Sequence, residues 1–420
     1  MISLVEALNY RCLRYIRQPL GPFHVLIGPN ASGKTTFLDV IAFLGRLISD
    51  GPDAAVEERT SNFQDLVWGR KGRSFELAIV AEIPENKRKK LKDSKYAYIR
   101  YEVSIGLKNE TDEVSILKEK VLLMSKSPVF SRKEPDLFPF AVAPPKTIFL
   151  RTTKGNHLVI HKAPSGKDLF YKEDKESGKS WDPVYVLGSR KSALANVPPD
   201  ESLFPISNWF KEMLRDKEGI QQLILNSQLI RKASPPGQKR TFKTDGSNLP
   251  FVVTELQKNS KERFGDWLNH LRTALPDLEN IKTIEMPDNK YRYLVICYRG
   301  GLEVPSWTAS DGTLRLLALT VLAYLPDIKG IFLIEEPENG IHPIAIETMY
   351  QSLQSVYNAQ VLIATHSPVI LKISDADKVL CFAKTDDGGT DIVLGSEHPR
   401  LRDWMDKVDM GDLFVGGVLG

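Results

Sequence analysis

The most constraining feature of the sequence is the stretch 28–36, which reads Gly-Pro-Asn-Ala-Ser-Gly-Lys-Thr-Thr. It matches the phosphate-binding loop pattern G-x-x-x-x-G-K-[ST], whose backbone N–H groups surround a phosphate chain. An apolar run at 23–27 precedes the loop, and apolar residues recur at helical spacing over 37–48. A strand, a glycine-rich loop and a helix are the context that the motif needs. The sequence therefore predicts a nucleoside triphosphate site.

The residue types in this loop predict separate parts in binding. The glycines permit a tight turn, Lys34 can reach the β- and γ-phosphates, and the Thr35 hydroxyl can ligate Mg²⁺. The expected nucleotide contacts are Asn30, Ala31, Ser32, Gly33, Lys34, Thr35 and Thr36. No residue that would read the base is identifiable, so the loop alone leaves the choice of nucleotide open.

The composition of the chain is typical of a globular protein. The chain has 420 residues, of which 42% are hydrophobic and 26% charged, as in ordinary globular proteins with two or three structural units. No apolar run approaches the roughly 20 residues that span a membrane. The start of the chain lacks the pattern of a signal peptide, and the three scattered cysteines suit a reducing compartment. We expect a cytoplasmic protein without a membrane partner.

A second group of polar residues follows roughly 300 positions after the loop. A buried strand ends in Glu335 and Glu336. The first carboxylate can hold Mg²⁺ and the second can polarise an attacking water. Ser310-Asp-Gly-Thr313 opens a helix and offers a second anion-binding helix end. His366 lies just past the next strand, at the edge where α/β sheets bind ligands.

In this order, the motifs resemble those of ABC-class ATPases, specifically the branch of the SMC, RecF and OLD proteins. The resemblance covers 1–83 and 300–385 well. It implies an α/β fold, with an ABC-type P-loop NTPase core in which helices flank a mixed sheet. It also implies ATP and Mg²⁺ as cofactors. Two copies would bind head to tail, so that Ser310 and Gly312 of one contact the γ-phosphate held by the other.

The resemblance also implies roles for single residues. Glu336 would be the catalytic base, His366 would steady the transition state, and the metal would be bound by Thr35, Gln64 and Glu335. The segment Glu338–His342 would be the D-loop. Three features depart from the family pattern. Glu335 replaces the usual aspartate, and Gln64 comes only about 30 residues after the loop lysine. Residues 310–313 resemble the ABC signature of this branch but lack its common Leu-Ser-Gly-Gly start. Gln64 could instead be a turn residue, and His366 a helix-start histidine.

Changes of pattern along the chain predict four segments. Short alternating runs predict an antiparallel β subdomain. Helical periodicity over 203–230 predicts a helical insertion. The stretch Gly51-Pro-Asp53 predicts a turn after the first helix. The segments are the N-terminal part of the ATPase core (1–95), the β subdomain (96–199), the helical insertion (200–278) and the C-terminal part of the core (279–420).

The remaining question is which kind of ABC-type ATPase this is. No long heptad stretch predicts a coiled-coil arm, and only 54 residues follow His366, too few for the Toprim nuclease of OLD proteins. We expect an ATPase that dimerises or oligomerises around ATP and controls a separate effector, a nuclease or toxin, in bacterial anti-phage defence. The alternatives are a RecF-like ATPase acting directly on DNA and a low-turnover nucleotide switch. The basic run 87–92 is either a solvated surface or a DNA contact.

Overall fold

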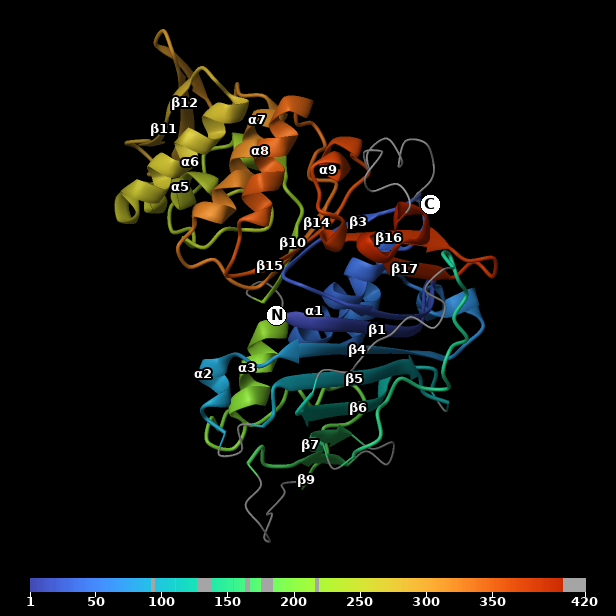
Figure 1. Cartoon of the computed structure of the whole chain (residues 1–420). Helices are drawn as coiled ribbons and strands as arrows, with labels where there is room; N and C mark the ends of the chain where they lie inside the picture. The colour runs from blue at the N-terminus through green and yellow to red at the C-terminus, as the bar shows by residue number, and fades with distance from the viewer. Residues whose placement is uncertain are drawn as a thin grey trace.

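The structure is a computed structural model that describes residues 1–91, 95–109, 111–126, 137–153, 155–162, 167–174, 184–215 and 219–402. Two large sheets and a helical layer form the molecule, and helix α1 (Lys34–Glu57) lies between the sheets (Figure 1). A small three-stranded sheet projects from the helical layer at one end of the molecule.

The six-stranded sheet carries the nucleotide motifs. Its strand order is β10-β14-β15-β3-β16-β17, and all neighbours are parallel except β16 and β17. The strands are β3 (Phe23–Ile27), β10 (Ile220–Leu223), β14 (Ile331–Glu335), β15 (Gln360–Ala364), β16 (Val379–Lys384) and β17 (Thr390–Leu394). Its central strands are short and almost entirely apolar because both faces are covered. This sheet, flanked by helices, confirms the predicted fold class.

The eight-stranded sheet is antiparallel throughout, in the order β2-β1-β4-β5-β6-β7-β8-β9. Its strands are β1 (Ile2–Tyr10), β2 (Leu13–Pro19), β4 (Ser74–Glu82), β5 (Tyr98–Leu107), β6 (Val114–Met124), β7 (Asn156–Lys162), β8 (Asp168–Phe170) and β9 (Val184–Tyr185). Because β4 pairs with β5 along its whole length, the boundary expected at 95/96 falls between two neighbouring strands of one sheet. The β-rich segment thus extends the N-terminal strands.

Helix α1 is the centre of the larger core. Its apolar residues contact both sheets, and on β14 the side chains of Ile331 and Leu333 face this core. The alternate residues Phe332 and Ile334 face the helical layer on the other side. The turn expected at Gly51 is confirmed: its φ of 90° and ψ of 178° are not helical, and they divide α1 into two helical parts, the second of which ends at Glu57. Glycine tolerates this conformation, and proline fits the first turn after the kink.

The second core lies between the parallel sheet and helices α5 to α8. The longer helices of this layer are α5 (Leu249–Asn259), α6 (Lys261–Ala274), α7 (Asp311–Thr320) and α8 (Pro343–Gln354); the projecting sheet is β11 (Leu278–Glu285), β12 (Arg292–Tyr298) and β13 (Leu302–Pro305). Strands β11 and β12 pair antiparallel as a hairpin. Within the described ranges, no helix combines the length and the apolar character that crossing a membrane requires.

The continuous helical pattern expected over 203–230 is wrong at its centre. Ile220–Leu223 forms β10, an edge strand that pairs in parallel with β14, between α3 (Pro205–Leu214) and α4 (Ser227–Arg231). Two apolar residues three positions apart fit a helix turn or a short strand equally well. The other short helices are α2 (Glu85–Arg88), α9 (Pro368–Lys372), α10 (Pro399–Arg402) and the 3₁₀ helices Phe63–Leu66, Trp68–Arg70, Val321–Tyr324, Ala376–Lys378 and Gly395–Glu397.

Candidate nucleotide-binding site

The phosphate loop joins β3 to α1 and depends on two glycines. Gly28 has φ 144° and Gly33 has φ 107°, a region that residues with a Cβ rarely adopt. A Cβ at Gly28 would also collide with the carbonyl oxygen of Phe382, and one at Gly33 with the side chain of Thr390. The loop therefore packs directly on β16 and β17, which hold its backbone in the turn.

Lys34 lies inside the loop that it belongs to. Its ammonium group donates to the carbonyl oxygens of Gly28 and Pro29 at 2.7 and 3.0 Å. Burial lowers the pKa of Lys34 to about 8, although the carboxylates of Glu336 and Glu335 act in the opposite direction. Among the described residues, no carboxylate lies within hydrogen-bond distance of this ammonium group, so an incoming polyphosphate would supply the opposite charge.

The start of α1 is suited to an anion. Gly33 is the N-cap and offers no side-chain acceptor to the first N–H groups of the helix. The Ser32 hydroxyl is buried and has no hydrogen-bond partner among the described residues. Unpaired donors at the N-terminus of a helix of 24 residues fit the phosphates of a nucleotide.

The Thr35 hydroxyl lies next to Glu335. Thr35 is on the first turn of α1, Glu335 ends β14, and the donor–acceptor distance is 2.6 Å. Both side chains are exposed, so a cation could reach them. A hydroxyl and a carboxylate are oxygen ligands of the kind that Mg²⁺ binds together with phosphate oxygens. The residues present therefore fit a magnesium–triphosphate complex.

Glu336 has an unusual backbone and a fixed side chain. Its φ of 46° is in the left-handed region, and its N–H donates to the carbonyl oxygen of Ala364 at 2.7 Å. The Asn339 amide donates to the Glu336 carboxylate at 2.6 Å. Left-handed backbone at a non-glycine residue is uncommon and costs energy, and such positions cluster at functional sites.

His366 is connected to the segment after β14. One oxygen of Glu338 accepts from the Thr365 hydroxyl at 2.5 Å and from the His366 N–H at 3.2 Å. Burial, together with the nearby Lys34 ammonium, lowers the pKa of the His366 imidazole, with Glu336 and Glu338 acting in the opposite direction. The ring is therefore mainly neutral near pH 7, and it lies close enough to Lys34 and Glu336 to respond to their charges.

The signature segment lies at the start of α7. Ser310 is the N-cap: its hydroxyl is exposed and accepts from the Thr313 N–H at 3.1 Å. Gly312 lies so close to the segment after β14 that a Cβ there would collide with the Gly340 carbonyl oxygen. Across the described residues, no hydrogen bond joins 310–313 to the phosphate loop. Within the described part of one chain, the signature segment thus packs on Gly340, in the turn after β14, and has no hydrogen bond to the phosphate loop.

Gln64 is in the 3₁₀ helix Phe63–Leu66. With its amide oriented so that the NH₂ group donates, it lies 2.8 Å from the Gly72 carbonyl oxygen and 3.3 Å from that of Arg70. These contacts hold together the loop that Gln64 belongs to. A metal role for Gln64 stays a prediction.

The sequence does not predict some of the contacts at the site. Thr390, on β17, donates to the carbonyl oxygen of Ser32 at 2.9 Å and so anchors the loop. A threonine in a strand is too common to be singled out without the fold. Glu338 and Asn339 lie in the expected D-loop, but their contacts with His366 and Glu336 follow only from the turn of the chain after β14.

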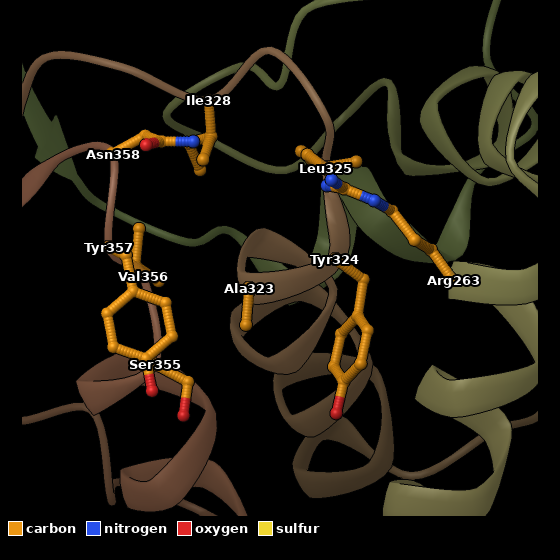
Figure 2. A pocket seen from close by; sticks show the side chains of 9 residues that line it. All are labelled: Arg263, Ala323, Tyr324, Leu325, Ile328, Ser355, Val356, Tyr357 and Asn358. Atoms are coloured by element: carbon orange, nitrogen blue, oxygen red, sulfur yellow. The ribbon is translucent and has the colours of Figure 1, made fainter.

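A cavity of about 320 Å³ lies apart from these residues (Figure 2). It opens between the segments that lead into β14 and β15, so it is at the opposite end of those parallel strands from Glu335 and His366. Tyr324 and Tyr357 flank it, and Arg263 reaches over it from α6. None of the expected nucleotide residues lines this cavity.

Comparison with known families agrees with the site geometry. Residues 23–372 match the family described as an AAA domain, putative AbiEii toxin, type IV toxin–antitoxin system. The chain belongs to this family. The match runs from β3 through the phosphate loop, signature and acidic strand to the helix after His366, so it includes all the predicted motifs, whereas β16 and β17 lie beyond it.

The chain is also similar to individual proteins and solved structures. A segment of 41 residues is 46% identical to an OLD nuclease of Thermus scotoductus. The matched segment makes up 10% of this chain and 8% of that protein. The fold is similar to an SMC head bound to the C-terminal winged-helix domain of ScpA, with a TM-score of 0.50, 14% identity, and coverage of 93% of this chain and 97% of the other. An SMC head derived from Pyrococcus furiosus gives a TM-score of 0.49 at 12% identity, covering 93% and 95%. The chain is thus an AAA-domain protein with the fold of an SMC head, and a short segment of it is similar to an OLD nuclease.

Proposed function

We propose that this chain binds and hydrolyses ATP in the space between two copies of itself, and that ATP-driven pairing controls a separate effector protein. The observation that carries the proposal is the separation of two half-sites within one chain. The phosphate loop, Glu335 and Glu336 form one half, whereas the exposed Ser310 hydroxyl, at the start of α7, has no hydrogen bond to that loop.

In this proposal each half-site residue has its own task. Lys34 and the N–H groups of α1 hold the triphosphate, and Thr35 and Glu335 hold Mg²⁺, which would neutralise charge that develops on the phosphates. Glu336, held by Asn339, accepts a proton from the attacking water. His366 stabilises the transferring phosphoryl group, and Ser310 and Gly312 of the partner copy close the site.

The effector belongs to the same proposal, and the descriptions of the family and of one relative support it. The family description names a toxin of a toxin–antitoxin system, and the Thermus scotoductus relative is named a nuclease. We propose that this chain acts in bacterial anti-phage defence, with a nuclease or toxin as the controlled partner.

Direct action on DNA has less support in the structure. In the described part of the run 87–92, Lys89 pairs with Glu85 and Lys90 pairs with Glu201, each at 3.0 Å. Ion pairing of two lysines lowers the local positive charge available to phosphates. The run therefore fits a solvated surface better than a DNA contact.

A mixing experiment tests the shared site. Lys34→Ala removes the phosphate contact and Ser310→Arg blocks the signature, so each variant alone should lose ATP turnover. In a mixture, head-to-tail pairs of unlike chains contain one intact site, and turnover should recover to at most about a quarter of the parent rate. A mixture no more active than the sum of its components would overturn the shared site.

A second experiment tests the effector. The Glu336→Gln variant binds ATP but should not turn it over, so it should hold the paired state. We expect products of the adjacent genes to co-purify with this variant in ATP and to be lost when Lys34 is replaced by alanine. Equal recovery with both variants would contradict ATP-dependent control.

A further inference from the structure

A cation from the helical insertion is fixed beside the signature. Arg231, the last residue of α4, donates through Nε and Nη2 to one carboxylate oxygen of Asp311 at 3.0 and 2.7 Å. Its Nη1 donates to the Trp307 carbonyl oxygen at 3.1 Å. The backbone accepts as well, since the Ser306 hydroxyl donates to the Arg231 carbonyl oxygen at 3.0 Å. Arg231 is thus held from several sides at the start of α7.

The ion pair between Arg231 and Asp311 matters because of where Asp311 lies. It is the first residue of α7, between Ser310 and Gly312, and its side chain is 54% exposed. A carboxylate at this position stabilises an empty helix N-terminus. It would also repel the γ-phosphate that the proposed function brings to the same helix end.

We infer that Arg231 is a positioning residue of the ATP-bound pair: by neutralising Asp311 it makes the signature compatible with the triphosphate held by the partner copy. The inference rests on the proposed function and extends it to the helical insertion. Arg231 acts through Asp311, and the Arg231 side chain is only 25% exposed. The insertion thereby affects ATP-driven pairing through one guanidinium group.

The geometry separates this role from simple anchoring of α4. A second contact also ties α4 to α7, because Arg315 Nε donates to the Ser227 hydroxyl at 3.3 Å. That contact is one turn further along α7 and places no charge at the signature. Loss of the Ser227 contact is therefore a matched control for anchoring, and loss of Arg231 alone changes the charge at the helix start.

The test measures ATP-dependent pairing by light scattering in the Glu336→Gln background. Arg231→Gln should raise the ATP concentration at half-maximal pairing by about tenfold, because one unbalanced negative charge then faces the nucleotide. Asp311→Asn added to Arg231→Gln should restore the parent value to within about threefold, and Asp311→Asn alone should pair at least as well as the parent. Ser227→Ala should leave pairing unchanged.

The outcomes are distinguishable. If the double variant pairs as poorly as Arg231→Gln, the charge argument is wrong and Arg231 only anchors α4. If Asp311→Asn alone prevents pairing, the carboxylate itself is needed and the inference is also overturned. Failure of the Glu336→Gln parent to pair in ATP would overturn the proposed function and this inference together. Thermal unfolding of each ATP-free variant identifies a change that merely disrupts the fold.

Discussion

The Thr35 hydroxyl on α1 donates a hydrogen bond of 2.6 Å to Glu335 at the end of β14, 300 positions further along the chain. Glu335 stands where related ATPases usually have an aspartate, and its side chain is one methylene longer. The contact shows that the longer side chain reaches the hydroxyl that would share a magnesium ion with it. The glutamate is thus compatible with the same ligand pair.

Glu335 can be tested by changing its length and its charge separately. Glu335→Ala should lower Mg²⁺-dependent ATP turnover by roughly 10- to 100-fold because one metal ligand is lost. Glu335→Asp keeps the charge but should still lose activity, because the shorter side chain no longer reaches Thr35. Turnover measured against Mg²⁺ concentration checks both. An alanine variant with an unchanged requirement for Mg²⁺ would remove Glu335 from the metal site.

ATP binding should take up protons near pH 8. Burial lowers the pKa of Lys34 to about 8, so near that pH about half of the free protein carries a neutral lysine. Bound phosphates favour the charged form, so binding at pH 8 should take up about half a proton, and affinity should fall as the pH rises above 8. Calorimetry in buffers of different ionisation enthalpy measures the uptake.

A variant with Lys34 replaced supplies the control for this measurement. Lys34→Arg keeps a cation that stays protonated at pH 8, so its ATP binding should show no uptake from this position. Equal proton uptake by the parent and the arginine variant would assign the protons to another group.

The parts of the site that lie within continuous motifs were predictable, because their chemistry is local. Gly33 and Lys34 follow from the spacing of the loop, and Glu335 follows from acid at the end of an apolar strand. The partners Asn339 and Arg231 were not predictable, since their roles depend on where a turn and a short helix lie in space.

Some parts of the fold could likewise be predicted from the sequence, and others could not. Buried strands such as β3 and β14 are continuous apolar runs, and their sequence identifies them. The strand β10 was missed because Ile220–Leu223 is stabilised mainly by its neighbour β14, a tertiary contact that overrides local periodicity. Likewise, the pairing of β4 with β5 joins segments that composition alone separates.

Arg100 is expected to be a stability residue of the antiparallel sheet. It is fully buried and donates to Glu102 at 2.7 Å, to Glu6 at 2.8 Å and to the Ile148 carbonyl oxygen at 2.9 Å. Arg100→Ala leaves two buried carboxylates without their cation and should lower the free energy of unfolding by about 3–5 kcal/mol. Urea denaturation measures the change. A loss below about 1 kcal/mol would show that water or local rearrangement compensates for the cation.

Asn339 should affect turnover without affecting ATP affinity. Its amide holds the Glu336 carboxylate at 2.6 Å, so Asn339→Ala frees the proposed base and should lower kcat by about tenfold. The ATP dissociation constant should change little, since Asn339 has no contact with the phosphate loop among the described residues. In the Glu336→Gln background the same substitution should have no further effect on turnover. A full additional loss there would mean that Asn339 acts independently of Glu336.

Glu338 should position His366 for the same reaction. Glu338→Ala leaves the Thr365 hydroxyl and the His366 N–H without their shared acceptor, so turnover should fall by roughly tenfold with little change in ATP affinity. Glu338→Gln retains a carbonyl oxygen in nearly the same place and should keep most of the activity. Single-turnover hydrolysis of bound ATP separates this effect from binding. Combined with His366→Ala, Glu338→Ala should add almost nothing if it acts through the histidine. Fully additive losses would instead assign Glu338 a part of its own in the site.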